Sequence, residues 1–332
     1  MTKTFIIAEA GVNHNGRLEL ALKLCDAAKE AGADAVKFQT WVTEKIIVPD
    51  TQKAAYQQAN TGGEQSQYQM LKALELGYGE FAQIKRYCDS IGITFLSTGD
   101  NPEDIDFLLG LGMPLVKVGS GDITNLPLLR HIGQCGKPVI LSTGMADMKM
   151  VRRAYKTLQD AGAKEITVLH CTTNYPCPPQ EVNLRAMLTM KEELGCPVGY
   201  SDHTLGTEVP VAAVALGATV IEKHLTLDSH MEGPDHAASM EPSAFKEMCR
   251  QIRAIEVALG SGIKEPNKSE KAISGVVLKR IVAARDIRQG EVLSLDNLAL
   301  KRAPEGLNVD HWDQVCGTPA RRDFKKDQAI EL

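Results

Sequence analysis

One unit recurs seven times along this chain and restricts its fold more than any other feature. Each copy is an amphipathic segment, then a glycine, then a short apolar run a few residues later. The glycines are Gly32, Gly92, Gly112, Gly136, Gly162, Gly195 and Gly217. A glycine just after a helix takes the left-handed conformation without a Cβ penalty, so each copy predicts the end of a helix followed by a strand.

The segments between these glycines have the periodicity of helices. In the first of them, Leu18, Ala21, Leu22 and Cys25 fall on one face. Adding the apolar run at residues 5–9 makes eight strands that alternate with helices. Such an α/β chain predicts parallel strands closed into a (β/α)8 TIM barrel. A doubly wound open sheet is the alternative, and the near-uniform units favour the barrel.

The barrel should occupy residues 1–260 and form the catalytic domain. Residues 41–77 are too long for an ordinary βα loop, so we expect an excursion over the active-site face. Residues 261–275 are polar and contain Gly and Pro, which is typical of a linker. Residues 276–332 carry short β-type runs with turn signals and predict a small, mostly β domain. This size is marginal for independent stability, which implies packing against something else.

The composition argues against several classes of protein. The formal net charge is −5 and no long Lys/Arg run is present, so we expect no nucleic-acid partner. The apolar runs are too short for a membrane span, and the N-terminus lacks the features of a signal peptide, which predicts a cytoplasmic protein. The eight cysteines form no Cys-x-x-Cys pair and are expected to be reduced, mostly structural thiols.

Polar residues end every predicted strand. Barrel enzymes carry their chemistry at the C-terminal ends of the strands, so a full ring of polar residues there indicates an active site. In chain order the residues are Glu9; Lys37 and Gln39; Ser97 and Thr98; Lys117 and Ser120; Ser142 and Thr143; His170, Cys171, Thr172 and Thr173; Ser201, Asp202 and His203; and Glu222, Lys223 and His224.

Lys37 and Lys117 bring two cations to this ring. Together with nearby hydroxyl groups they would suit a phosphate or a carboxylate. The alternative is that the two lysines form ion pairs with the strand-end acids Glu9 and Glu222. The hydroxyl donors are Thr98, Ser120 and Ser142.

His203 and His224 end two adjacent strands, so their imidazoles could meet at one metal ion. A single histidine in a strand is more often a hydrogen-bonded core residue. Two imidazoles supplemented by oxygen donors do not make the closed tetrahedral site of structural zinc, and they suit an exchangeable Mn²⁺ or Mg²⁺ ion. His236 follows the eighth strand and could cover the mouth of the barrel.

Several strings in the chain resemble the sialic acid synthases, including the legionaminic acid synthases of bacteria. They are Ile7-Ala-Glu-Ala-Gly-Val-Asn-His-Asn-Gly16, Val36-Lys-Phe-Gln-Thr40, Leu141-Ser-Thr-Gly-Met145, Gly199-Tyr-Ser-Asp-His-Thr204, Ile221-Glu-Lys-His-Leu-Thr226 and Gly233-Pro-Asp-His236. The tail is similar to the antifreeze-like (SAF) domain that this family carries. Its strings are Val282-Ala-Ala-Arg-Asp-Ile-Arg-Gln-Gly-Glu291 and Leu300-Lys-Arg-Ala-Pro304.

The resemblance implies roles for most of these residues. Those implied for phosphoenolpyruvate are Lys37, Thr98, Lys117, Ser120, Ser142 and Ser201, and those implied for Mn²⁺ or Mg²⁺ are His203 and His224. The sugar side would be lined by Glu9, Asp122, Tyr175 and Asp235. Gln39 is a further candidate for substrate contact. The resemblance also implies a domain-swapped homodimer in which Arg302 of one chain reaches the sugar in the other.

Two strings depart from the family pattern. The family usually follows Ser-Thr at the third strand with Pro-Phe-Asp, whereas this chain has Ser97-Thr98-Gly99-Asp100-Asn101. After Arg302 the chain has Ala303-Pro304 where family members often have Pro-Gly. We therefore expect differences in the third-strand loop and in the loop that follows Arg302.

The resemblance, together with these residues, implies a metal-dependent synthase that condenses phosphoenolpyruvate with an N-acetylated mannosamine-type sugar and releases phosphate by C–O cleavage. Glu9, Lys37, Lys117 and Asp235 are the expected catalytic residues. The sugar is either N-acetylmannosamine or 2,4-diacetamido-2,4,6-trideoxymannose. One alternative is a phosphoenolpyruvate-condensing enzyme that acts on a phosphorylated sugar, which would need an additional arginine cluster. The other is a non-catalytic binding protein that uses its C-terminal domain.

Overall fold

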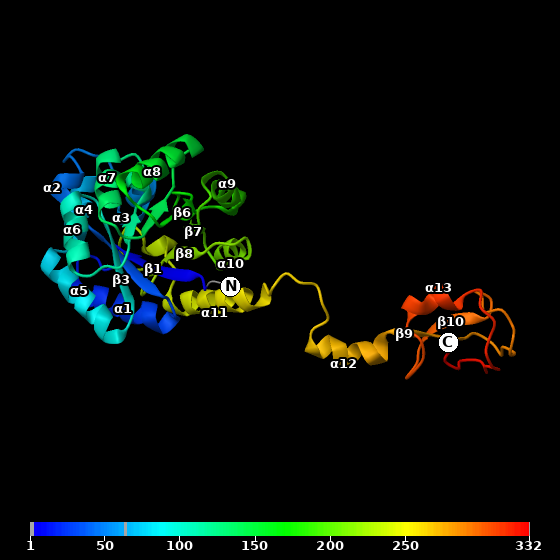
Figure 1. The fold of residues 1–332 in the computed structure, drawn as a ribbon. Coiled ribbons are helices and arrows are strands. Elements are labelled where there is room, and N and C mark those ends of the chain that lie inside the picture. The colour runs from blue at the N-terminus through cyan, green and yellow to red at the C-terminus, as the bar shows by residue number, and fades with distance from the viewer. Residues whose placement is uncertain (1–2, 63–64, 332) are drawn as a thin grey trace. The chain divides into compact units, whose positions relative to one another are not determined.

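The computed structural model describes residues 3–62 and 65–331 (Figure 1). The chain divides into two compact units, Met1–Gly260 and Ser261–Leu332. Each unit has its own hydrophobic core. None of the helices in the described residues combines the length and the apolar character that crossing a membrane requires.

The first unit contains the predicted TIM barrel. Eight parallel strands pair in chain order, and the last strand closes the barrel on the first. The apolar residues of the strands are almost all buried, as expected for parallel strands covered by helices. The strands are β1 (Phe5–Gly11), β2 (Ala35–Thr40), β3 (Thr94–Gly99), β4 (Val116–Val118), β5 (Val139–Ser142), β6 (Ile166–Cys171), β7 (Val198–Asp202) and β8 (Val220–His224).

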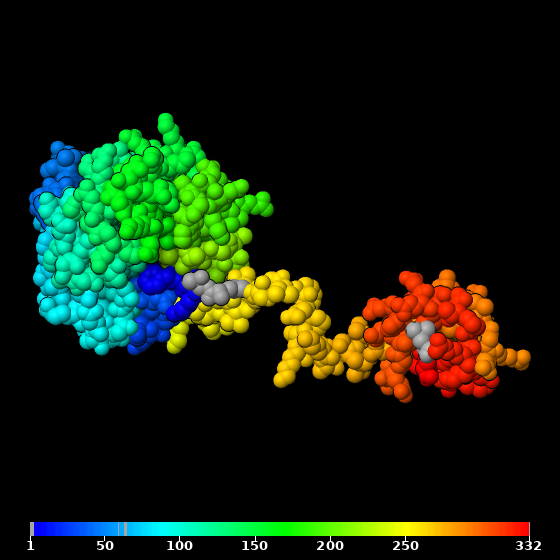
Figure 2. Space-filling view, in the orientation of Figure 1, coloured from blue at the N-terminus to red at the C-terminus, as the bar shows by residue number. Residues whose placement is uncertain are grey.

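Helices cover the outside of the barrel, and in the space-filling view their cyan and green segments form most of the visible face of this unit (Figure 2). All seven repeated glycines have positive φ, from 62° at Gly195 to 118° at Gly162, which confirms the predicted helix ends. The helices are α1 (Leu18–Ala31), α5 (Tyr78–Ile91), α6 (Pro102–Gly110), α7 (Leu126–Gln134), α8 (Met148–Ala161), α9 (Arg185–Leu194), α10 (Glu208–Ala215) and α11 (Pro242–Ala258).

The segment between β2 and α5 forms three short helices, α2 (Thr43–Ile46), α3 (Ala55–Thr61) and α4 (Gln67–Leu74). It has a small core of its own, in which Trp41, Met70 and Leu74 are buried. The Asn60 side chain donates a hydrogen bond to the Pro234 carbonyl at 2.7 Å, in the segment after β8. The excursion therefore contacts the loops at the C-terminal end of the barrel.

The second unit is a small β module. Strands β9 (Lys279–Ala283) and β10 (Leu298–Arg302) pair in antiparallel register, and a short helix α13 (Trp312–Val315) follows. Ile281, Phe324 and Ile330 are among its buried core residues.

A helix, α12 (Lys268–Val277), begins in the stretch that the sequence predicted to be a linker and runs two residues beyond it. Asn267 caps its N-terminus, and the backbone N–H of Asn267 donates to the Glu270 carboxylate in return. This reciprocal capping box was present in the sequence as Asn267-Lys-Ser-Glu270, and it explains the helix where the polar composition indicated a coil.

Candidate active site

The strand register brings the predicted polar residues together at one end of the barrel. Glu9 pairs with Lys37 on one side and with His224 on the other, while Thr98 pairs with Lys117 and Ser201 with Glu222. They surround a cavity of about 510 Å³. The predicted site residues that line it are Glu9, Lys37, Gln39, Thr98, Lys117, Ser120, Asp122, Ser142, Tyr175, Ser201, His203 and His224.

Lys37 is buried and lies between two acids. Its Nζ is 2.7 Å from Glu9 Oε2 and 3.9 Å from Glu222 Oε2, and it donates to Thr98 Oγ1 at 3.2 Å. Burial raises the pKa of Glu9, with Lys37 opposing the shift. Gln39 donates to the other Glu9 oxygen at 3.0 Å. The ion pairs considered as an alternative for the lysines are therefore present.

Lys117 completes the charged cluster. Its Nζ is 3.4 Å from Glu222 Oε1 and donates to Ser142 Oγ at 2.8 Å. Burial lowers the pKa of Lys117 although Glu222 opposes this effect. Two lysines and two acids therefore offset each other's charge, and hydroxyl groups surround them. A site of this kind keeps two cations inside the barrel, with Glu9 as an acid that can gain a proton when an anion binds.

His203 and His224 face each other at the ends of β7 and β8, with ring centroids 5.4 Å apart. His203 Nδ1 lies 2.7 Å from the Thr172 carbonyl, which can only accept, so Nδ1 carries a proton and Nε2 is the nitrogen left for a ligand. The ring of Tyr175 packs against both, with centroid distances of 4.1 Å and 5.5 Å.

The surroundings of the histidine pair fit a divalent cation. His224 Nδ1 is buried without a hydrogen-bond partner among the described residues and lies 3.9 Å from Asp235 Oδ2. Burial and the neighbouring charge of His203 hold the pKa of His224 well below its usual value, so its ring is neutral at pH 7. The two imidazoles and a nearby carboxylate make the mixed nitrogen and oxygen donor set that suits Mn²⁺.

Two predicted site residues lie outside the cavity lining. Asp235 is buried beside His224, and burial raises its pKa to about 6 although His203 opposes the shift. Arg302 ends β10 in the second unit and is exposed. The structure thus gathers twelve of the fourteen predicted residues around one cavity and leaves the position of Arg302 relative to it undefined.

His236 has a structural position. Its Nδ1 lies 2.7 Å from Thr226 Oγ1 and its Nε2 lies 3.1 Å from Asn15 Oδ1, and the ring is fully buried. It therefore ties the segment after β8 to the loop after β1 and does not enter the cavity.

The sequence did not single out every residue that lines the site. Glu222, noted only as a partner for the lysines, contacts both of them and accepts from Ser201 Oγ at 3.2 Å. Cys171 lines the cavity with its sulfur 3.8 Å from His203 Nδ1. Glu222 and Cys171 both lie at the end of a predicted strand, and this position is the sequence feature that could have indicated that they line the cavity. Lys45 and Asp100 also line it, and their positions depend on loop geometry.

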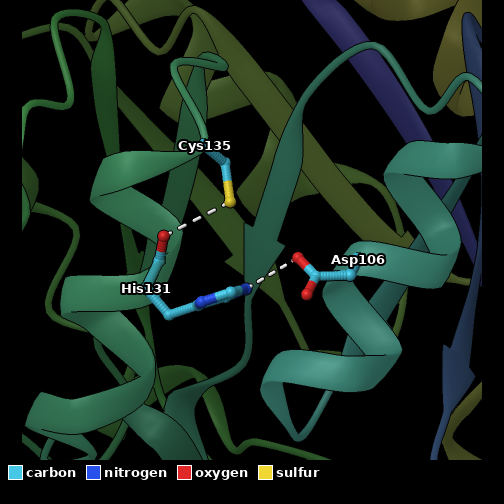
Figure 3. A group of neighbouring side chains, drawn as sticks. All are labelled: Asp106, His131 and Cys135. Carbon is cyan, nitrogen blue, oxygen red and sulfur yellow. Dashed lines mark hydrogen bonds and ion pairs between the residues drawn. The ribbon is translucent and has the colours of Figure 1, made fainter.

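A separate group of potential metal ligands lies at the outer helices α6 and α7, where Asp106 of α6, His131 of α7 and Cys135 just after α7 come together (Figure 3). The ring of His131 points toward Asp106, with 2.8 Å between Nε2 and Oδ1, and the Cys135 thiol donates to the His131 carbonyl. Another such group is Asp228, His230 and Glu241. None of these residues lines the cavity, so neither group belongs to the site at the barrel mouth.

Comparison with known proteins finds a matching family model for each of the two units. The model of the NeuB family matches residues 24–264, and that of the SAF domain matches residues 280–331. The chain is 47% identical to the N,N'-diacetyllegionaminic acid synthase of Campylobacter jejuni, covering 99% of both chains. It is 46% identical to the enzyme of the same name from Legionella pneumophila, covering 95% of this chain and 89% of the relative.

A solved structure agrees with this placement. The N-acetylneuraminic acid synthetase of Leptospira borgpetersenii is 34% identical and superposes with a TM-score of 0.71, over 82% of this chain and 90% of that one. The barrel with its ring of polar strand ends, the SAF domain and the identity along the whole chain agree, and the protein therefore belongs to the NeuB family.

Proposed function

We propose that this protein is a nonulosonate synthase that condenses phosphoenolpyruvate with an N-acetylated mannosamine-type sugar, giving a legionaminate- or neuraminate-type acid and phosphate. The observation that carries the proposal is that a lysine-based anion site and a pair of imidazoles line the same cavity. The identity to the Campylobacter and Legionella synthases supports the class and makes 2,4-diacetamido-2,4,6-trideoxymannose the first sugar to test.

Phosphoenolpyruvate would bind at the lysine cluster. Lys37 and Lys117 are held close together and can each face one anionic group of the ligand, the phosphate or the carboxylate. Because the two lysines are buried, their charges are weakly screened and fix the orientation of the ligand strongly. The hydroxyl groups that would complete the site belong to Thr98, Ser120, Ser142 and Ser201.

His203 and His224 would hold Mn²⁺ or Mg²⁺ beside this anion site, with Asp235 next to His224. A bound ion supplies Lewis acidity to the carbonyl oxygen of the open-chain sugar. The neighbouring protein groups fix the ligands: the Thr172 carbonyl sets the tautomer of His203, and Tyr175 restricts both rings.

In the reaction, C3 of phosphoenolpyruvate forms a bond to the aldehyde carbon, and the aldehyde oxygen gains a proton. Water then adds to C2, and phosphate leaves with cleavage of the C–O bond. Glu9 and Asp235 are the acids proposed to exchange protons with the sugar oxygens, because burial raises the pKa of both above that of an exposed carboxyl.

The proposal extends to a homodimer in which Arg302 of one copy reaches the sugar in the other. The α12 helix supports it, because its apolar side chains are exposed: Ile273 by 56% and Val276 by 72%. Exposed apolar groups on a short helix are typical of a surface that a partner covers.

The two alternatives are less well supported. A second phosphate on the sugar would need an arginine cluster, and among the described residues that line the cavity the cations are lysines and histidines. A non-catalytic binding role that uses the C-terminal domain would not account for the two lysines and two imidazoles that line the barrel cavity.

The proposed chemistry is tested with phosphoenolpyruvate carrying ¹⁸O in the bridging C–O bond. The full-length protein is supplied with this substrate, Mn²⁺ and 2,4-diacetamido-2,4,6-trideoxymannose or N-acetylmannosamine, and products are analysed by mass spectrometry. We expect the label in phosphate, together with an acid whose mass is that of sugar plus pyruvate. Label retained in the organic product would contradict C–O cleavage.

A further inference from the structure

The loop after β3 directs one acid, Asp100, into the cavity, and the chemistry proposed above gives this acid no role. Gly99 packs against the start of α6: a Cβ placed there would lie 3.0 Å from both Asp104 Cβ and Ile105 Cδ1. Asn101 is held by Asp104 Oδ2, which accepts from its backbone and side-chain nitrogens at 3.1 Å and 3.2 Å. With both neighbours fixed, Asp100 between them lines the cavity.

Asp100 has no hydrogen-bond partner of its own in the part of the chain that the structure describes. Lys37, the cation that acts on Asp100, is already paired with Glu9 at 2.7 Å. Asp122, from the turn after β4, lines the same wall of the cavity and accepts from Asn125 Nδ2 at 2.9 Å. Two carboxyl groups therefore face the cavity from the β3 and β4 side, apart from the imidazoles that end β7 and β8.

The charged groups around Asp100 favour its neutral form. Burial raises its pKa to about 8, and the neighbouring acids Asp122 and Asp104 add to this, whereas Lys37 opposes it. Lys45, which also lines the cavity, pairs with Glu103 at 3.4 Å. At pH 7 the Asp100 carboxyl is therefore mostly protonated and can both donate and accept a hydrogen bond.

The two carboxyl groups of Asp100 and Asp122 suit a neutral ligand. Phosphoenolpyruvate is a multiply charged anion, and a pair of carboxyl groups is a poor site for it. An acylated amino sugar is uncharged and carries hydroxyl, amide N–H and carbonyl groups, which are the partners that a donor–acceptor carboxyl pair satisfies.

We propose that Asp100, together with Asp122, binds the amino sugar by its hydroxyl and amide groups and thereby contributes to the choice of sugar. The inference rests on the proposed synthase function and adds a sugar-binding residue at a position where the sequence departs from the family pattern. Asp100 forms part of a sugar subsite across the cavity from His203 and His224.

The test compares steady-state kinetics of the full-length protein with Mn²⁺, for each of the two candidate sugars. For Asp100→Ala we expect the KM for sugar to rise about three- to tenfold, as for loss of one hydrogen bond, and the KM for phosphoenolpyruvate to stay within about twofold. Asp100→Asn keeps a donor and an acceptor, so its KM for sugar should change less. Asp106→Asn, in the following helix α6 and outside the cavity lining, is the matched control.

The pH dependence separates sugar binding from a structural role. As pH rises through about 8, wild-type Asp100 ionises and loses its donor, so the KM for sugar should rise, whereas Asp100→Asn should remain flat. The same rise in Asp100→Asn would overturn the inference. So would an equal change in both KM values for Asp100→Ala, or no change in either. If Asp100→Ala does not fold, the pH profile of Asp100→Asn decides.

The two claims can fail separately. A wild-type protein that releases no phosphate with any sugar would refute the proposed function, and this inference with it. An active wild type whose sugar KM is unaffected by replacing Asp100 would refute the inference alone.

Discussion

At the scale of single residues, Glu222 controls the charge balance of the cavity. It contacts Lys117 at 3.4 Å and Lys37 at 3.9 Å, and these lysines lower its pKa although burial opposes the shift. Removing one member of such a buried cluster leaves a charge without its partner, and that is more costly than removing an oppositely charged pair together.

Replacing Lys117 by Met should therefore have two separable effects. The variant should lose about 3 kcal/mol in free energy of unfolding, measured with urea, because Glu222 then has only the more distant Lys37. It should also bind phosphoenolpyruvate weakly in calorimetry. The double variant Lys117→Met with Glu222→Gln should regain most of the stability but not the binding. A single variant as stable as the wild type would contradict this account of the cluster.

The imidazole pair gives a second prediction at this scale. His203→Ala and His224→Ala should each lower turnover by about two orders of magnitude or more at limiting Mn²⁺, and bound Mn²⁺ measured by paramagnetic resonance should fall. His131→Ala, in the outer group of Figure 3, is the matched control and should change neither quantity. Near-normal turnover in both cavity variants would refute the metal assignment.

At the scale of elements, the left-handed glycines after the helices fix where each strand begins. Gly112 has a φ of 89°, and Gly110 lies in the last turn of α6. A Cβ added at either position would meet open space. The two glycines therefore differ in backbone conformation but not in crowding, and they make a matched pair.

Gly112→Ala should lower the free energy of unfolding by about 1 kcal/mol, because alanine is strained in the left-handed region. Gly110→Ala should be neutral or slightly stabilising, because alanine favours the helix and restricts the unfolded chain. Urea unfolding of the two variants measures both. Equal effects would show that the sign of φ does not determine the cost at Gly112.

Comparison of the predicted with the observed helices and strands shows which parts of the fold could be predicted from the sequence. The glycine spacing predicted seven strands and the ends of the helices before them, and the apolar run at residues 5–9 predicted the first strand, because these signals are local. Helix α12 was not predicted, since the stretch in which it begins is polar and contains Gly and Pro, and its capping box is short. The side chain of Asp100 could not be placed from sequence, because its direction depends on how closely Gly99 packs against α6.

At the scale of the whole molecule, the two units have separate cores, and the barrel closes on itself within residues 1–260. The sequence predicted which side chains would meet at the barrel mouth, because the ends of parallel strands in a barrel converge. It could not place Arg302 relative to the cavity, because Arg302 belongs to the second unit, which has its own core.

A fragment of residues 1–260 should therefore fold cooperatively and still bind phosphoenolpyruvate, whose proposed ligands all lie in the barrel. It should be monomeric by light scattering and should turn over sugar at least tenfold more slowly, as for loss of one charged contact. Arg302→Ala in the full chain should share the slow turnover but remain dimeric. A fragment with full activity would contradict the proposed role of the second unit.

The most direct test of the central claim is the rate of phosphate release from phosphoenolpyruvate in the full-length protein, with each sugar in turn and with or without a chelator. The account predicts release only when phosphoenolpyruvate, an N-acetylated mannosamine-type sugar and a divalent cation are present together. Release without sugar, release that the chelator does not affect, or no release with any sugar would contradict it.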